Sequence, residues 1–224
     1  IHATLIDMNG EIGRIDGGVG FSLNQPGWHI TFKSNSNDKF RLNCPEEVER
    51  TIILNIIKIV HDKLDIGNLI NGLEITIKKF IPDHVGLGSK TQLTLAIIDG
   101  IGCFLEDTEN KWNRDQLITL SNRGGTSGIG ITTFFEGGAI IDAGHSFGIG
   151  CDKQDFLPSS ASNAPAPPVL LRAELPNNWK AVCAIPDLPK GVHDSEEINI
   201  FQEYCPIPLK EIRALSHLIL MRLM

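Results

Sequence analysis

Aromatic side chains are scarce in this 224-residue sequence, which is 6% aromatic and contains one tyrosine. Positive charge is also in deficit, because 20 lysines and arginines stand against 27 aspartates and glutamates and leave a net charge of -7. An acidic chain is a poor match for nonspecific binding to nucleic acid or to an anionic membrane. An anionic substrate would therefore need a local pocket of hydrogen-bond donors, or a metal ion.

Cysteine spacing and apolar run length exclude further classes. The five cysteines are odd in number and far apart, and none forms a Cys-x-x-Cys pair. This argues against a zinc site and predicts reduced, mostly structural thiols. No apolar run approaches the ~18 residues of a membrane helix, and no leader-like segment opens the sequence. We therefore expect a cytoplasmic protein without a membrane partner.

The remaining composition, 42% hydrophobic and 21% charged, is that of a globular protein. Alternating residues predict a hairpin of strands 2–9 and 13–23, with Asn9-Gly10 at its turn. Further strands are expected at 28–32, 39–42, 73–81, 138–143, 169–175 and 179–185. Helices are expected at 45–64, 91–105, 114–121, 129–135, 195–204 and 209–224. This mixture predicts an α+β fold.

The segment 144–168 is rich in Gly, Ser, Ala and Pro, which is typical of a domain joint or a mobile active-site loop. We therefore place an N-terminal domain at 1–145 and a partial C-terminal domain at 146–224. The sequence opens inside a strand-like run, and its last apolar helix stops without a cap signal. We expect it to be a fragment.

A glycine loop lies at 82–92, Pro-Asp-His-Val-Gly-Leu-Gly-Ser-Lys-Thr-Gln, between a strand pattern and a strongly apolar helix pattern. Glycine permits positive φ and close approach of a ligand, and a helix N-terminus offers free N–H groups that suit phosphate. We interpret the loop as an anion cradle formed by Gly86, Gly88, Ser89, Lys90 and Thr91. The alternative is an ordinary turn before a helix, and the spacing matches neither the Walker nor the dinucleotide motif.

The residues Pro82-x-x-x-Gly86-Leu87-Gly88-Ser89 resemble the central motif of the GHMP kinase superfamily. Segments 1–10, 14–20, 123–130 and 156–162 extend the resemblance over nearly the whole chain. With them, the sequence resembles one branch of that superfamily, the β-ribofuranosylaminobenzene 5′-phosphate synthases. The resemblance implies a GHMP-kinase-like two-layer α+β fold, with a mixed sheet packed against helices and an incomplete C-terminal domain.

The resemblance also implies an enzyme, a pentosyltransferase of methanopterin biosynthesis. Such an enzyme condenses phosphoribosyl pyrophosphate with 4-aminobenzoate or 4-hydroxybenzoate and releases CO2 and pyrophosphate. It implies Mg²⁺ as cofactor and, from family habit, a homodimer. Mg²⁺ prefers one or two protein carboxylates plus phosphate oxygens, so we predict Asp7 and Asp16, which flank the Asn9-Gly10 turn, as its ligands. A turn-capping role is an equal alternative for Asp7.

Candidate catalytic residues are Asp16, Arg123, Ser127 and His145. The planar guanidinium of Arg123 suits a carboxylate or a phosphate, with a surface ion pair as the alternative. A proton transfer during restoration of the aromatic ring would suit His145, with a plain loop role as the alternative. Additional substrate-binding candidates are Arg14, Thr126, Ser159 and Ser160; for Arg14, support of Asp16 is as plausible as a phosphate contact.

Gly130 marks a departure from the kinases of the superfamily. Mevalonate kinase and its relatives carry Pro-Ser-Gly-Val-Asp, whose Asp acts on the acceptor hydroxyl, whereas this sequence has glycine at the matching position. A kinase would lose its base here, but attack by an aromatic carbon does not need one. Two alternatives stay open: a small-molecule kinase that uses ATP, and a non-enzymatic ligand-binding protein of the same fold.

Overall fold

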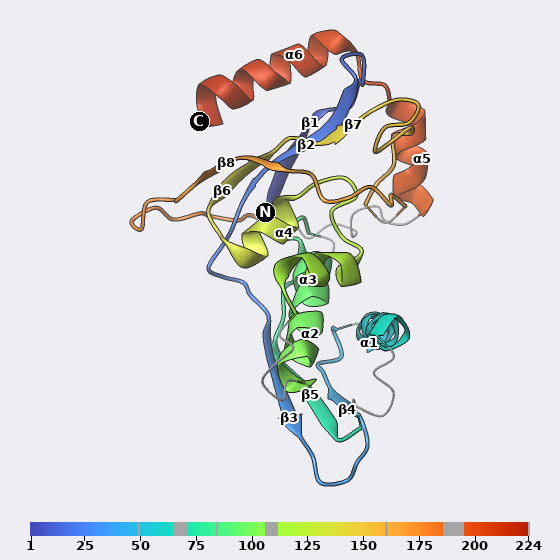
Figure 1. The fold of residues 1–224 in the computed structure, drawn as a ribbon. Helices are drawn as coiled ribbons and strands as arrows, with labels where there is room; N and C mark the ends of the chain where they lie inside the picture. The colour runs from blue at the N-terminus through green and yellow to red at the C-terminus, as the bar shows by residue number, and fades with distance from the viewer. Residues whose placement is uncertain are drawn as a thin grey trace. The chain divides into compact units, whose positions relative to one another are not determined.

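The structure, a computed structural model, describes residues 1–48, 50–64, 71–83, 85–105, 112–159, 161–185 and 195–223 (Figure 1). Its contacts divide the chain into two compact units. The first unit comprises Ile1–Leu23, His84–Gly88 and Arg123–Met224, and the second comprises Asn24–Asp83 and Ser89–Asn122. The predicted domain boundary near residue 145 stays a prediction, although strands on either side of it pair in the first unit.

The first unit is built on an antiparallel sheet. Its strands are β1 (His2–Asp7), β2 (Arg14–Phe21), β6 (Ala139–Asp142) and β8 (Val169–Ala173), in the order β1-β2-β6-β8, and β7 (His145–Ser146) also pairs with β2. The predicted hairpin of β1 and β2 is confirmed. Its connection is longer than the two-residue turn we expected, because the last pair in register is Asp7 with Asp16.

The helices of the first unit are α4 (Ile129–Phe135), α5 (Ser195–Tyr204) and α6 (Leu209–Leu218), which continues as the π-helical turn η2 (Ile219–Leu223). The predictions for α4 and α5 are confirmed. The strand expected at 179–185 is wrong, because these residues are assigned no strand and Trp179 and Val182 are exposed. These residues pair with no strand in the described part of the chain.

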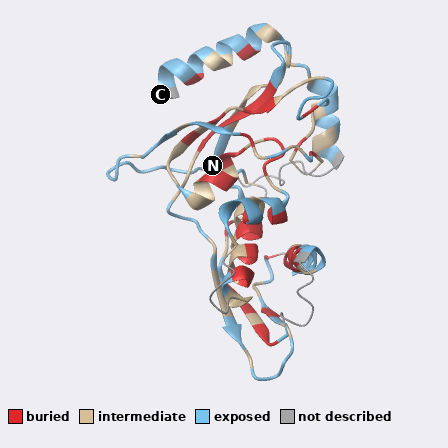
Figure 2. Ribbon diagram, in the orientation of Figure 1, coloured by how far each residue is buried: buried red, intermediate tan, exposed pale blue. Residues whose placement is uncertain are grey.

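The second unit contains a mixed sheet of β3 (His29–Ser34), β5 (Leu73–Lys79) and β4 (Arg41–Asn43), in which β3 is antiparallel and β4 parallel to β5. Its helices are α1 (Arg50–Leu64), α2 (Ser89–Leu105) and α3 (Arg114–Ser121). Buried residues alternate along β5 and line α2 (Figure 2). A capping box between Asn113 and Gln116 fixes the start of α3, and the helix expected at 114–121 is confirmed.

Two helix starts differ from expectation. The helix expected from Pro45 begins at Arg50, because Pro45 accepts a hydrogen bond from Val48 in a turn (3.1 Å). The helix expected from Thr91 begins two residues earlier, at Ser89. Within the described residues, no helix has the length and apolar character required to cross a bilayer.

Candidate functional site

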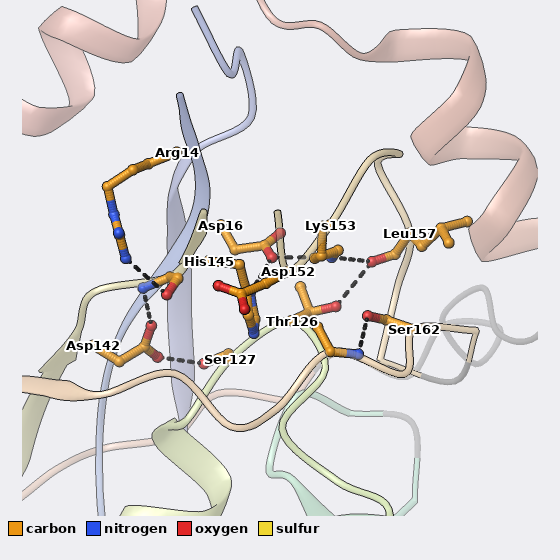
Figure 3. Close-up of polar contacts among 12 residues, drawn as sticks. Arg14, Asp16, Thr126, Ser127, Asp142, His145, Asp152, Lys153, Leu157 and Ser162 are labelled. Carbon is orange, nitrogen blue, oxygen red and sulfur yellow. Dashed lines mark hydrogen bonds and ion pairs between the residues drawn. The ribbon is translucent and has the colours of Figure 1, made fainter. Parts of the chain in front are cut away.

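A buried carboxylate, Asp16, is the centre of the polar cluster in the first unit (Figure 3). It lies on β2 with a left-handed backbone (φ 68°) and is 1% exposed. Its Oδ2 accepts a hydrogen bond from Lys153 Nζ at 3.0 Å and lies 2.7 Å from His145 Nδ1. Its Oδ1 is buried without a hydrogen-bond partner in the described part of the chain. All three charged or polar side chains are thus withdrawn from solvent.

The other contacts of these side chains determine where hydrogens lie. His145 Nε2 is 2.8 Å from the Pro165 carbonyl, which only accepts, so Nε2 carries a hydrogen. The contact of Nδ1 with the carboxylate also needs a hydrogen. Asp16 and His145 therefore share one and form a pair that is neutral overall. Lys153, which also donates to the Leu157 carbonyl at 2.9 Å, adds an ammonium to this pair.

A second buried carboxylate, Asp142, holds the start of α4. Its Oδ2 accepts from Ser127 Oγ at 3.0 Å and from the Gly128 N–H at 2.8 Å, and its Oδ1 accepts from the Gly144 N–H at 3.0 Å. Ser127 Oγ in turn accepts from the Ile129 N–H at 3.2 Å. The hydroxyl that we predicted to be catalytic is thereby engaged in local structure.

Arg14 is fixed at an exposed position by the turn between β6 and β7. Its Nε and Nη2 donate to the Ala143 carbonyl at 3.2 and 2.7 Å, and Nη2 also donates to the Gly144 carbonyl at 3.0 Å. Only glycine suits this turn, because Gly144 has φ +62° and a Cβ there would clash with the Ile15 carbonyl oxygen. The guanidinium is therefore held in one place at the surface.

The magnesium ligation predicted for Asp7 and Asp16 stays a prediction; the two residues stand opposite each other in the register of β1 and β2. Asp7 Oδ1 accepts hydrogen bonds from the N–H groups of Asn9 (2.7 Å) and Gly10 (3.2 Å), which is the turn-capping alternative. Asp16 Oδ2 faces the ammonium of Lys153, and its Oδ1 has no hydrogen-bond partner in the described part of the chain. The described ranges contain no cluster of three or more His, Cys, Asp or Glu that could hold a metal.

The glycine loop before α2 is open. Gly86 and Gly88 are exposed and have positive φ (76° and 69°), and no described atom beyond their chain neighbours lies within 4 Å of where a Cβ would stand. Glycine is needed there for backbone conformation rather than for space. The loop belongs to the same compact unit as Asp16 and Ser127.

Ser89, Lys90 and Thr91 open α2 in the second unit. The hydroxyl of Ser89 donates to Asp83 Oδ1 at 2.5 Å, and its carbonyl accepts from Trp28 Nε1 at 3.1 Å. Ser89, Lys90, Asp83 and Trp28 help to line a small pocket. This unit thus has a pocket at the helix start where we predicted a cradle.

The other predicted residues lie along segments 123–126 and 156–162. Arg123 is half-buried; burial lowers the pKa of its guanidinium, and the nearby carboxylate of Glu197 on α5 opposes that shift. Thr126 is buried and its hydroxyl donates to the Leu157 carbonyl at 2.9 Å. Ser159 is half-buried, and Ser160 lies outside the described residues. These observations leave the predicted roles of Arg123, Ser159 and Ser160 as predictions.

Two residues of the site, Lys153 and Asp142, were absent from the sequence predictions. Lys153 lies in the Gly- and Pro-rich segment and contacts Asp16 across 137 positions, so no local spacing marks it. Asp142 ends β6 just before Ala-Gly, and a carboxylate near the end of the strand expected at 138–143 is the signal that could have identified it.

Comparison with known proteins establishes the family. The family model of the GHMP kinases N terminal domain matches residues 51–138. β-Ribofuranosylphenol 5′-phosphate synthases of Methanothermobacter thermautotrophicus, Methanocaldococcus jannaschii and Archaeoglobus fulgidus are 40, 39 and 42% identical over all of this chain. The chain belongs to this synthase family. It spans 67, 68 and 66% of the three synthases, about two thirds of their length.

Solved structures similar to this member of the synthase family include two mevalonate kinases. The enzyme of Methanococcus jannaschii gives a TM-score of 0.43 at 18% identity, covering 62% of this chain and 50% of that one. Another mevalonate kinase gives 0.42 at 19% identity, covering 61 and 50%. The family match, together with the helices and the mixed sheet of the second unit, confirms the predicted α+β fold of GHMP kinase type.

Proposed function

We propose that this chain belongs to a ribosyltransferase that condenses phosphoribosyl pyrophosphate with 4-hydroxybenzoate or 4-aminobenzoate and releases CO2 and pyrophosphate. The observation that carries the proposal is 39–42% identity along the whole chain to three β-ribofuranosylphenol 5′-phosphate synthases. Their name describes a ribose phosphate joined to a phenol, which favours 4-hydroxybenzoate as the acceptor. The proposal includes methanopterin biosynthesis as the pathway, the cytoplasm as the location and a homodimer as the active form.

The proposed step balances without removal of a ring proton. The bond from ribose C1 to pyrophosphate breaks, and its electron pair leaves with pyrophosphate. The ring carbon that bears the carboxylate supplies the pair for the new carbon–carbon bond. Loss of CO2 then returns a pair to the ring. The proton transfer that we predicted for His145 is therefore not required, and its burial at 1% exposure suits a positioning role.

Binding is assigned to the exposed groups. We assign the pyrophosphate to the backbone N–H groups of the open loop at Gly86 and Gly88, because a glycine loop before a helix suits an anion. Mg²⁺ would enter with the pyrophosphate, since this ion keeps phosphate oxygens and water as ligands. The fixed guanidinium of Arg14 suits the 5′-phosphate or the benzoate carboxylate. The contribution of Lys90 stays a prediction.

The test uses the full-length protein with phosphoribosyl pyrophosphate, Mg²⁺ and carboxyl-labelled 4-hydroxybenzoate or 4-aminobenzoate. We expect labelled CO2 and pyrophosphate in equal amounts. Arg14→Gln should reduce the rate strongly, while Arg213→Gln, at an exposed arginine of α6, serves as the matched control. Absence of CO2 with both acids would contradict the proposal.

A small-molecule kinase is the second candidate, favoured by the match to the GHMP kinases N terminal domain. Against it, Gly130 on α4 supplies no carboxylate for an acceptor hydroxyl. Formation of ADP that depends on an added alcohol would support the kinase. Ligand binding without any turnover in the full-length protein would instead favour a non-enzymatic protein of this fold.

A further inference from the structure

Lys153 is a buried lysine that the proposed reaction does not use. It is 4% exposed, and its ammonium contacts Asp16 Oδ2 and the Leu157 carbonyl. Its main chain also closes the loop that follows β7, because its N–H donates to the Ser146 carbonyl at 3.1 Å. Burial of an ammonium is costly and rare. The side chain and the main chain of Lys153 are both held in place by these hydrogen bonds.

The contacts of Lys153 lead to the turn that holds Arg14. Asp16 Oδ2 contacts both Lys153 Nζ and His145 Nδ1 (Figure 3). The contact with His145 joins β2 to β7. In the same two strands, β7 pairs with the first residues of β2, so Arg14 and His145 sit on adjacent rungs. The two carbonyls that fix the guanidinium come directly before His145, at residues 143 and 144.

We propose that Lys153 is a positioning residue for Arg14. Its ammonium holds the Asp16 carboxylate, the carboxylate holds the His145 ring, and the backbone before that ring aims the guanidinium. Lys153 itself touches no substrate. The inference rests on the proposed function in one respect only: the partner of Arg14 is taken to be an anionic group, a phosphate or a carboxylate.

A purely structural role for Lys153 makes a different prediction. Removing one partner of a buried ion pair lowers thermal stability whatever residue stands at position 14. Any loss of ligand affinity would then multiply with the loss caused by a change at Arg14. A positioning role instead makes the two losses overlap, because both changes act through the same contact.

The experiment is a double-mutant cycle on the full-length protein with Arg14→Gln, Lys153→Met and the double variant. Isothermal titration calorimetry measures Kd for inorganic phosphate, pyrophosphate and 4-hydroxybenzoate, with thermal melts in parallel. For the anion whose Kd rises most in Arg14→Gln, we expect Lys153→Met to weaken binding about tenfold in the natural background. In the Arg14→Gln background we expect less than about a twofold further loss.

Equal losses in both backgrounds, or no loss from Lys153→Met, would overturn the proposal, as would an Arg14→Gln variant that binds all three anions normally. If Lys153→Met shows no cooperative melt, the cycle uses Lys153→Gln, which keeps hydrogen-bond donors on a side chain one bond shorter. If that variant is also unfolded, Lys153 is a folding determinant and the proposal is wrong. Failure of CO2 release would remove the proposed reaction but leave this binding cycle decisive.

Discussion

Two glycine-rich stretches precede helices in this molecule, and they use glycine for different reasons. Gly86 and Gly88, before α2, have positive φ and open space where a Cβ would stand. Before α4 the space is filled: a Cβ on Gly124 would lie 2.8 Å from Ala166 Cβ, and one on Gly125 would lie 2.7 Å from the Ser162 carbonyl oxygen. The first stretch is accessible to a ligand, whereas the second is packed against the chain itself.

The Asp142 carboxylate at the start of α4 is a second difference between the two stretches. Asp142 accepts hydrogen bonds from Ser127 and from the Gly128 N–H, which are donors that a bound anion would otherwise use. The motif that resembles a kinase active-site segment is thus occupied by a residue of the protein. A sequence motif therefore indicates the fold. Where a ligand can bind depends on whether the N–H groups at the start of the helix are open or already bonded to the protein.

The largest effect should come from Gly125→Ala. Its Cβ would clash with the backbone of Ser162. The shift that the clash forces on the chain should lower the free energy of unfolding by about 3 kcal/mol. Urea melts measure the change. Gly27→Ala is the control, because no described atom beyond its chain neighbours lies within 4 Å of the place that its methyl group would take. Equal stability of the two variants would show that the second stretch is not crowded.

Ser127→Ala should have the next largest effect. It removes one of three donors to the buried Asp142 carboxylate, and hydrogen bonds to charged groups contribute about 1.5 kcal/mol or more to stability. Chemical denaturation measures this loss. A fall in turnover far beyond the unfolded fraction would return Ser127 to the catalytic role that the sequence predicted.

Gly88→Ala should destabilise the protein by about 1 kcal/mol, because the residue has φ 69° but no crowding. Its effect on pyrophosphate affinity should exceed that of Gly125→Ala once both proteins are compared in their folded state. Calorimetric titration with pyrophosphate provides the comparison. A greater loss of pyrophosphate affinity in Gly125→Ala than in Gly88→Ala would contradict the assignment of the pyrophosphate to the stretch before α2.

The smallest effect should come from Ser146→Ala, because Ser146 donates to an exposed carboxylate, whereas Ser127 donates to a buried one. Ser146 donates to Asp152 Oδ2 from its hydroxyl (2.6 Å) and its N–H (3.1 Å), and these bonds lower the pKa of Asp152 below its ordinary 3.8. A carboxylate whose pKa is lowered by folding stabilises the folded state at pH values above its ordinary pKa. This stabilisation is lost as the pH falls through its pKa in the folded protein. Because Asp152 is exposed, the gain is small. Thermal melts of variant and natural protein should differ slightly near neutral pH and converge in strong acid; a difference that grows in acid would contradict this sign.

Much of the fold could be predicted because its signals are local. The hairpin of β1 and β2, the three helices at 114–121, 129–135 and 195–204, and the alternating burial of β5 all follow from short-range patterns. Segment 179–185 shows the limit of such patterns, since its alternation predicts a strand but its residues are exposed and pair with no described strand.

The polar cluster shows why the site could be predicted only in part. Asp16 and His145 stand beside glycines, which distinguishes them in the sequence, and the structure brings the two together. Their shared partner Lys153 is distant in sequence, and nothing near it distinguishes it from a solvated lysine. The long-range pairing of β7 with β2, rather than any motif, creates the cluster.

The most direct test of the central claim is an NMR titration of the ¹⁵N-labelled full-length protein with inorganic pyrophosphate in the presence of Mg²⁺. We predict that the amide signals of Gly86 and Gly88 shift with saturation, while those of Gly124 and Gly125 stay in place. Shifts confined to Gly124 and Gly125 would contradict the account, because the diphosphate would then bind at the stretch that packs against Ser162 and Ala166.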